Sequence, residues 1–273
     1  MKFKLAAFAD EADGNLDGQI KAMSENDISY LEIRGVDGQN IADISEAKAR
    51  EIRSKMDQAG LAVWSLGSPY GKIGINDDFE SHLDKFKHSL DIADILGAKH
   101  IRLFSFYGTN GEEKNKDKVF ELLNRFIQAA QGSGIILCHE NEKGIYGDIA
   151  SRCLEIHKAL PQLKAVFDPA NFVQCGQDTK EAWQLLHPYV EYMHIKDALA
   201  DGSVVPAGKG QGNLPYLLKE YKGQVLTLEP HLSVFAGFDQ LEASEKTKMK
   251  YTYPSSRAAF DAAVNALKKI IAF

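Results

Sequence analysis

Short apolar segments recur along the chain at intervals of roughly 30 residues, and amphipathic stretches long enough for a helix separate most of them. This alternation is typical of repeated βα units. The pattern predicts eight strands, at Phe3–Ala9, Tyr30–Arg34, Ala62–Leu66, His100–Phe104, Ile135–Glu140, Ala165–Asp168, Tyr192–Lys196 and Val225–Glu229.

The stretches between these strands carry helix start and stop residues. Ser45 is an N-cap candidate for a helix that Gly60 stops, and Gly97 follows the end of another. The last helix has apolar residues spaced to form one buried face. The predicted helices include Ser45–Gln58, His82–Leu96, Lys116–Ala130, Thr179–Leu186 and Ser255–Ile271.

Eight such alternations favour a single (β/α)8 TIM barrel over an open, doubly wound sheet. A closed barrel needs about 250 residues, and the chain has 273. The open sheet usually carries a GxGxxG turn after its first strand, whereas this strand ends in Ala9-Asp10-Glu11-Ala12. No Pro-rich or Gly/Ser-rich linker divides the chain, so we expect residues 1–273 to form one domain.

Composition indicates an ordinary soluble protein. Hydrophobic residues make up 44% of the chain and the net charge is −6, which disfavours a nucleic-acid partner. The N-terminal apolar run is broken by Asp10 and Glu11, and no segment has the roughly 20 apolar residues that span a bilayer. The three cysteines lack metal or disulfide spacing. We therefore expect a cytoplasmic protein without a signal peptide or a membrane partner.

Polar residues of metal-binding type close the fifth to eighth predicted strands. In a (β/α)8 barrel the active site lies at the C-terminal ends of the strands. Three carboxylates and one imidazole at this position suit a divalent ion such as Mn²⁺ or Mg²⁺, and the absence of thiolates disfavours structural zinc. The four residues are Glu140, Asp168, His194 and Glu229.

Each of these residues, taken alone, also has a purely structural interpretation. A single acid after a strand is more often a helix N-cap or a loop acceptor, and a lone histidine is more often a hydrogen-bonded core residue. When four adjacent strands end this way, a metal site becomes the favoured interpretation. So much uncompensated charge at one low-dielectric end of the barrel would otherwise cost several kcal/mol. We therefore expect one divalent ion.

Five short segments form an ordered set along the chain: Glu140-Asn141, Asp168-Pro169-Ala170-Asn171, His194-Ile195-Lys196-Asp197, Pro206-Ala207-Gly208-Lys209-Gly210 and Leu228-Glu229. This set resembles the xylose-isomerase-like barrel superfamily, which includes sugar isomerases, epimerases and AP endonuclease 2-type proteins. The resemblance covers essentially the whole chain. It implies that the four residues above bind one metal, commonly manganese or magnesium, and that Glu140 and Glu229 exchange protons with the substrate.

The chain departs from this pattern at Asn171, where many members have a histidine, and at Lys209, where the loop often carries an acid. Asn171 can hydrogen-bond a sugar hydroxyl but cannot act as a base. Lys196, His231 and Arg102 are further candidates for substrate binding.

Other residues near the predicted strand ends have two interpretations. Glu32 and Arg34 alternate on the second strand, so they either both line the barrel interior or pair with each other. Lys72, together with Arg102, is a candidate for recognising a phosphate or carboxylate. Aromatic candidates for the wall of a sugar pocket are Trp64, Phe104, Phe106 and Tyr107, although core packing explains Trp64 and Phe104 as well.

The sequence thus predicts a divalent-metal-dependent isomerase or epimerase of a sugar or sugar phosphate. The two glutamates would move a proton through an enediolate. Three alternatives stay open: a keto-cyclitol dehydratase, a non-catalytic sugar-binding protein, and a DNA-repair endonuclease, which Asn171 and the net charge disfavour. The sugar, the ion, the oligomeric state and the role of residues 234–252 are not determined by the sequence, and a homo-oligomer stays open.

Overall fold

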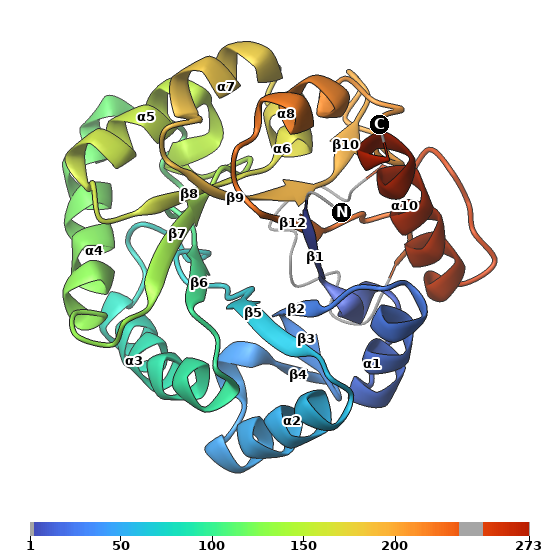
Figure 1. Cartoon of the computed structure of the whole chain (residues 1–273). Coiled ribbons are helices and arrows are strands. Elements are labelled where there is room, and N and C mark those ends of the chain that lie inside the picture. The colour runs from blue at the N-terminus through green and yellow to red at the C-terminus, as the bar shows by residue number, and fades with distance from the viewer. Residues whose placement is uncertain (1–2, 235–247, 273) are drawn as a thin grey trace.

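The centre of the molecule is a closed barrel of eight parallel strands (Figure 1). The computed structural model describes residues 3–234 and 248–272. The strands are β1 (Lys4–Ala7), β2 (Tyr30–Ile33), β5 (Ala62–Leu66), β6 (His100–Leu103), β7 (Ile136–Glu140), β8 (Lys164–Phe167), β9 (Val190–Ile195) and β12 (Val225–Leu228). Their order around the barrel is β1, β12, β9, β8, β7, β6, β5 and β2, which pairs with β1. The predicted (β/α)8 barrel is therefore confirmed.

Helices surround the barrel on its outside (Figure 1). They are α1 (Leu16–Glu25), α2 (Glu46–Gln58), α3 (Phe79–Leu96), α4 (Lys116–Ala129), α5 (Ala150–Ala159), α6 (Pro169–Gln174), α7 (Thr179–Leu186), α8 (Leu214–Glu220) and α10 (Ser256–Ile271). Two small antiparallel pairs extend the loops, β3 (Gly35–Val36) with β4 (Gln39–Asn40) and β10 (Asp197–Ala198) with β11 (Val204–Val205).

Several helix ends follow from local chemistry. The Ser45 side chain accepts from the Lys48 amide at the start of α2, as expected of an N-cap. Gly97 ends α3 in the left-handed region with φ +72°, which glycine adopts at little cost. The prediction placed the start of α3 at His82, which was three residues too late, because Asp78 caps the helix by accepting from the amides of Glu80 and Ser81.

Most predicted strands ran one or two residues too far at their C-terminal ends. The first strand ends at Ala7, and residues 9–11 form the 3₁₀ helix η1 (Ala9–Glu11). Arg34, Phe104, Asp168, Lys196 and Glu229 likewise follow their strands directly. The polar groups therefore stand on the rim of the barrel, where the chain leaves the strand to begin a loop.

Two apolar cores flank the strands. The larger one fills the space between the barrel and the helices, whereas a smaller one inside the barrel contains Cys138, Tyr192 and Val225. Within the smaller core Trp64 stacks on His100 at 4.1 Å, near the N-terminal ends of the strands. Of the two interpretations of Trp64, the structure therefore supports core packing rather than a place in the wall of a sugar pocket.

Candidate metal centre

The four predicted ligands converge on the rim of the barrel. One ligand atom from each of Glu140, Asp168, His194 and Glu229 lies within 4.8 Å of all the others. All four side chains are buried. Metal–ligand bonds of about 2.0–2.6 Å separate opposite ligands by about 4–5 Å, so one cation fits among these atoms. That they bind an ion stays a prediction.

Asp168 serves both the fold and this cluster. It caps α6, because its Oδ1 accepts from the Asn171 amide at 3.0 Å, and Pro169 occupies the first turn. The side chain of Asn141 holds the Asp168 backbone from both sides, with two hydrogen bonds of 2.9 Å. These contacts use one carboxylate oxygen for the helix and leave Oδ2 at the cluster.

His194 lies between acidic groups. Its Nδ1 is 2.9 Å from Glu140 Oε1 and 3.1 Å from Glu229 Oε2, while its Nε2 is 3.2 Å from Glu32 Oε2. The ring of Phe8 packs edge-on against the imidazole at 5.2 Å. Burial lowers the pKa of His194, but Glu140, Glu32 and Glu229 together hold it well above its usual value.

Two candidate substrate-binding cations lie directly on the cluster. Lys196 Nζ is 2.9 Å from Asp168 Oδ2 and 3.3 Å from Glu229 Oε2. Arg102 Nη1 is 3.1 Å from Glu140 Oε2 and 3.6 Å from Glu229 Oε1. Both side chains are buried, so they were placed here at a substantial desolvation cost.

The cluster fits a divalent cation chemically. Glu140 Oε2 and Asp168 Oδ2 are buried without a hydrogen bond, although each is within ion-pair distance of a cation. The pKa of Asp168 is raised to about 7, chiefly because the group is buried; Lys196 opposes this shift, whereas Glu140 and Glu229 add to it. Carboxylate oxygens and one imidazole are the ligand types expected for Mn²⁺, Mg²⁺ or Zn²⁺.

Asn171, the third candidate for substrate binding, contacts the cluster from α6. Its Nδ2 donates to the Asn141 carbonyl at 2.9 Å and to Glu140 Oε1 at 3.4 Å. The amide therefore orients Glu140, and its contact with a sugar hydroxyl stays a prediction.

A second polar group borders Glu229 on the β1 side. Arg34 binds Asp10 through two hydrogen bonds of 2.9 Å and contacts Glu229 Oε1 at 3.1 Å. Glu11 accepts from the His231 amide at 2.7 Å, and the His231 ring lies 3.6 Å from Glu229. Burial raises the pKa of Glu11 to about 8, an effect that the nearby Arg34 opposes.

Asp10 and Glu11, which border the cluster, were not among the residues predicted from the sequence. They directly follow the predicted first strand, Phe3–Ala9, so the rule that selected the other strand ends would have found them. For Glu32 and Arg34, the first interpretation holds, since both face the barrel interior and each pairs with other residues.

Of the remaining candidates for substrate contact, some lie beside the rim and one lies in the hydrophobic core. Lys72 and Arg102 lie over the Phe104 ring at 4.3 Å and 4.8 Å, which places both cations beside the rim. Phe106 was wrongly expected to line a sugar pocket: it packs against Phe79 and Phe126 among the helices.

The glycine-rich loop after β11 is organised by one carboxylate. Asp197 accepts from the amides of Gly208, Gly210 and Gly212 at 2.8–2.9 Å and from the Ala198 amide at 3.0 Å. A side chain at Gly212 would bring its Cβ to 2.7 Å from Asp197 Oδ1, so this position requires glycine. Lys209 lies over the Tyr251 ring at 5.2 Å. Most of the segment 234–252 whose role the sequence left open lies outside the described residues.

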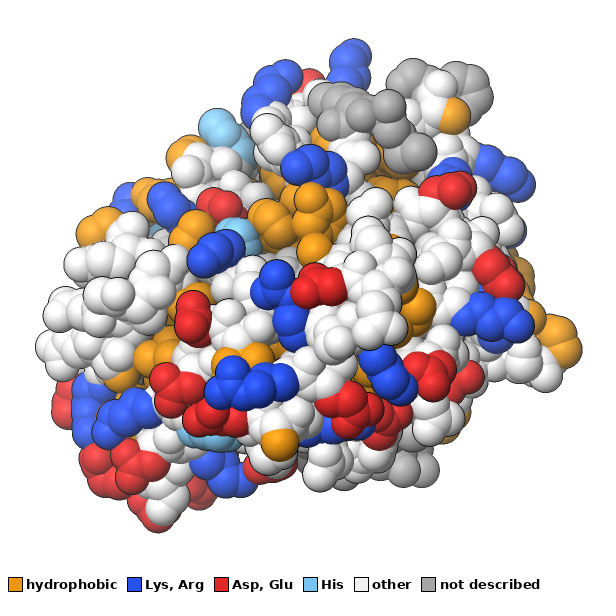
Figure 2. Space-filling view, turned by 60° about the horizontal axis from the view of Figure 1, so that its bottom comes forward, with side chains coloured by type: hydrophobic (Ala, Val, Ile, Leu, Met, Phe, Trp, Pro, Cys, Tyr) orange, Lys and Arg blue, Asp and Glu red, His pale blue; other side chains and the backbone are white. Residues whose placement is uncertain are grey.

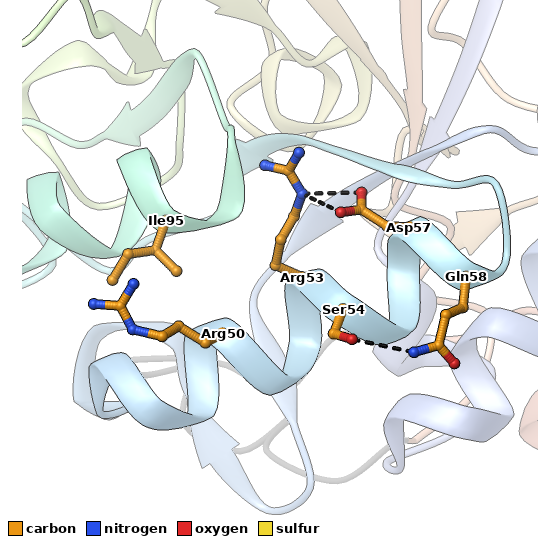
Figure 3. Close-up of a pocket in the computed structure, with 6 residues that line it drawn as sticks. All are labelled: Arg50, Arg53, Ser54, Asp57, Gln58 and Ile95. Atoms are coloured by element: carbon orange, nitrogen blue, oxygen red, sulfur yellow. Dashed lines mark hydrogen bonds and ion pairs between the residues drawn. The ribbon is translucent and has the colours of Figure 1, made fainter.

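Among the residues that the structure describes, no second group of three or more His, Cys, Asp or Glu side chains lies close enough together to hold a metal ion. A groove between α2 and α3 is lined by Arg50 and Arg53, and Figure 3 shows the pairing of Arg53 with Asp57. Arg50 pairs with Glu46 of the same helix. Basic and acidic side chains are interspersed over the face shown in Figure 2. Within residues 3–234 and 248–272, no helix is long and apolar enough to span a membrane.

Comparison with known proteins identifies the family. The family described as xylose isomerase-like TIM barrel matches residues 20–231, and the chain belongs to it. No curated protein matches the sequence.

Solved structures share the whole fold at low identity. The probable 3-DHS dehydratase AsbF from Bacillus anthracis has a TM-score of 0.75 and 16% identity over 98% of this chain and 99% of that one. The IolI protein with a bound zinc atom has a TM-score of 0.75 and 17% identity over 99% and 98%. The 3-keto-D-glucoside 4-epimerase YcjR from E. coli has a TM-score of 0.69 and 15% identity over both full chains.

Proposed function

We propose that the protein is a divalent-metal-dependent isomerase or epimerase acting on a sugar or sugar derivative. The observation that carries this proposal is the convergence of four buried ligand atoms within 4.8 Å of one another, two of them from glutamates on different strands. Membership of the xylose isomerase-like family and the fold shared with a 3-keto-D-glucoside 4-epimerase support it.

Glu140, Asp168, His194 and Glu229 would hold the ion. When bound, a divalent ion acts as a Lewis acid that makes a proton beside a carbonyl easier to remove. The protein's own groups then perform the transfer. One glutamate accepts the carbon-bound proton, and a proton returns from a glutamate to the neighbouring carbon in isomerisation or to the opposite face in epimerisation.

The two cations on the cluster suit the charge that this transfer creates. Removing the proton leaves negative charge on the former carbonyl oxygen. Lys196 and Arg102 stand at the cluster, so each can donate a hydrogen bond to that oxygen without prior rearrangement of the backbone. Asn171 keeps Glu140 oriented during the transfer.

The test has two parts. Metal analysis of the purified full chain should find one divalent ion per chain after exposure to Mn²⁺. The Mn²⁺-loaded protein is then incubated with ketoses, aldoses and inososes in deuterated water, and products are followed by NMR and mass spectrometry.

The product distinguishes the competing reactions. Isomerisation and epimerisation replace carbon-bound hydrogen by deuterium with otherwise unchanged mass, whereas a dehydratase product is lighter by one water. Ion binding with neither exchange nor product across all three substrate classes would contradict the proposed enzyme and favour a sugar-binding protein.

A further inference from the structure

Glu32 is a buried carboxylate that the proposed proton transfer does not use. It lies inside the barrel with no exposed surface. Barrels of this type usually fill their interior with branched apolar side chains, and an ionised carboxylate is costly there unless its oxygens are paired. The contacts of Glu32 explain its presence.

Both oxygens of Glu32 accept hydrogen bonds. Oε1 lies 2.7 Å from the Tyr192 hydroxyl, and Oε2 lies 3.2 Å from His194 Nε2. Ser65 Oγ lies 3.3 Å from the Tyr192 oxygen. An ionised carboxylate only accepts, so Tyr192 must donate its hydrogen to Glu32 and Ser65 must donate to Tyr192. For the same reason Nε2 of His194 must carry a hydrogen.

A hydrogen on Nε2 determines what the other ring nitrogen can do. A metal ion binds only the neutral imidazole, in which Nδ1 then has a free lone pair. This nitrogen faces Glu140 Oε1 at 2.9 Å and Glu229 Oε2 at 3.1 Å, and these ionised oxygens are also acceptors. Three lone-pair donors directed at one place form a binding site for a cation.

The geometry points to Glu32 as a positioning residue for the metal centre: we propose that it holds His194 in the Nε2–H tautomer and thereby directs Nδ1 at the ion. This inference rests on the proposed metal-dependent function. Tyr192 and His194 are two residues apart on β9 and face the same side, so the Ser65–Tyr192–Glu32 chain lies directly behind the ligand. Carboxylates behind metal-binding histidines typically raise metal affinity 10–100-fold.

The first experiment measures Mn²⁺ affinity of the full chain by calorimetry and needs no substrate. Glu32→Gln should raise the Kd by about 10–100-fold. Tyr192→Phe, which leaves Glu32 ionised but less firmly held, should raise it less. Glu191→Gln is the matched control, because Glu191 contacts His100 Nε2 at 3.2 Å at the opposite end of the barrel. Its Kd should equal that of the unaltered protein.

An unchanged Kd in Glu32→Gln, beside normal binding in the unaltered protein, would overturn the role of Glu32 and leave the proposed function intact. No Mn²⁺ binding by the unaltered protein would instead contradict the proposed metal-dependent function itself. The two failures are therefore distinguishable.

A second experiment does not need the Glu32 variant, so it holds even when Glu32→Gln fails to fold. The chain is labelled with ¹⁵N-histidine and loaded with ¹¹³Cd²⁺. The His194 resonances are those lost in His194→Gln. We expect cadmium coupling to Nδ1 and a hydrogen on Nε2, and coupling to Nε2 would refute the proposed tautomer.

Discussion

Substituting Glu229 by glutamine tests the acid–base role of this residue while a side chain of similar size still fills its place. Glutamine keeps the shape of the side chain but cannot take up a proton at neutral pH. General acid–base catalysis contributes about 10²- to 10⁴-fold, so we expect Glu229→Gln to lower kcat by this factor at saturating Mn²⁺. At about 1.36 kcal/mol per tenfold, the barrier rises by about 3–5 kcal/mol.

The structure indicates that this variant still folds. Glu229 contacts three permanently charged side chains, and each retains another carboxylate partner. Arg34 keeps Asp10 at 2.9 Å, Lys196 keeps Asp168 at 2.9 Å and Arg102 keeps Glu140 at 3.1 Å. Removing the Glu229 charge therefore leaves none of these buried cations isolated, which is the case that would be strongly destabilising.

The assay follows exchange of the substrate's carbon-bound hydrogen in deuterated water, using the sugar that the substrate screen identifies. Glu191→Gln is the control, because Glu191 pairs with His100 away from the rim. Saturating Mn²⁺ separates loss of the base from weaker ion binding. Full exchange activity in Glu229→Gln would refute the assignment of this glutamate to proton transfer.

Three further predictions concern the ion, pH and the loop. Asp168→Asn retains a cap acceptor for α6 but loses a charge, so calorimetry should show at least about tenfold weaker Mn²⁺ binding with little change in Tm; unchanged affinity would exclude Asp168 as a ligand. Burial lowers the pKa of His157 from 6.5 to about 4. Between these pH values the unfolded chain therefore binds a proton that the native chain does not. About 3 kcal/mol of the free energy of unfolding should be lost as pH falls from 6.5 to 4. His157→Gln should therefore show a flatter Tm between these pH values, and an identical slope would contradict this cause. Gly212→Ala should displace the loop from Asp197 and cost about 1–3 kcal/mol, which urea unfolding and limited proteolysis would detect as lower stability and faster cleavage near residues 206–213; no change in either would show that the loop tolerates the methyl group.

The sequence predicted the barrel because hydrophobic periodicity reports burial directly. Each strand is covered by helices and reads as a short apolar run, and caps such as Ser45 and Gly97 mark helix ends with local chemistry. The ends of the strands were predicted less accurately. Residues such as Glu229 directly follow the last residue of their strand, and the sequence pattern does not show where the strand stops. Pairing between strands is a tertiary property that such patterns do not encode.

The candidate ligands were predictable for a similar reason. Their position after consecutive strands determines which end of the barrel they share. Which side chain contacts which was not predictable, because it depends on register around the barrel. The contact of Glu32 with His194 joins residues 162 positions apart, and the Trp64 ring stacks on His100 inside the barrel. These contacts become visible only in the folded barrel.

In the loop after β11, the groups that determine the path of the main chain are different from the exposed side chains. Its path is determined by backbone amides bound to Asp197, while the side chains of Lys209 and Gln211 are exposed and take no part in that anchoring. Substitutions at these two positions can therefore be accommodated without moving the main chain. This loop is therefore a region where the exposed side chains can vary while Asp197, and with it the adjacent Lys196 at the cluster, stays in place.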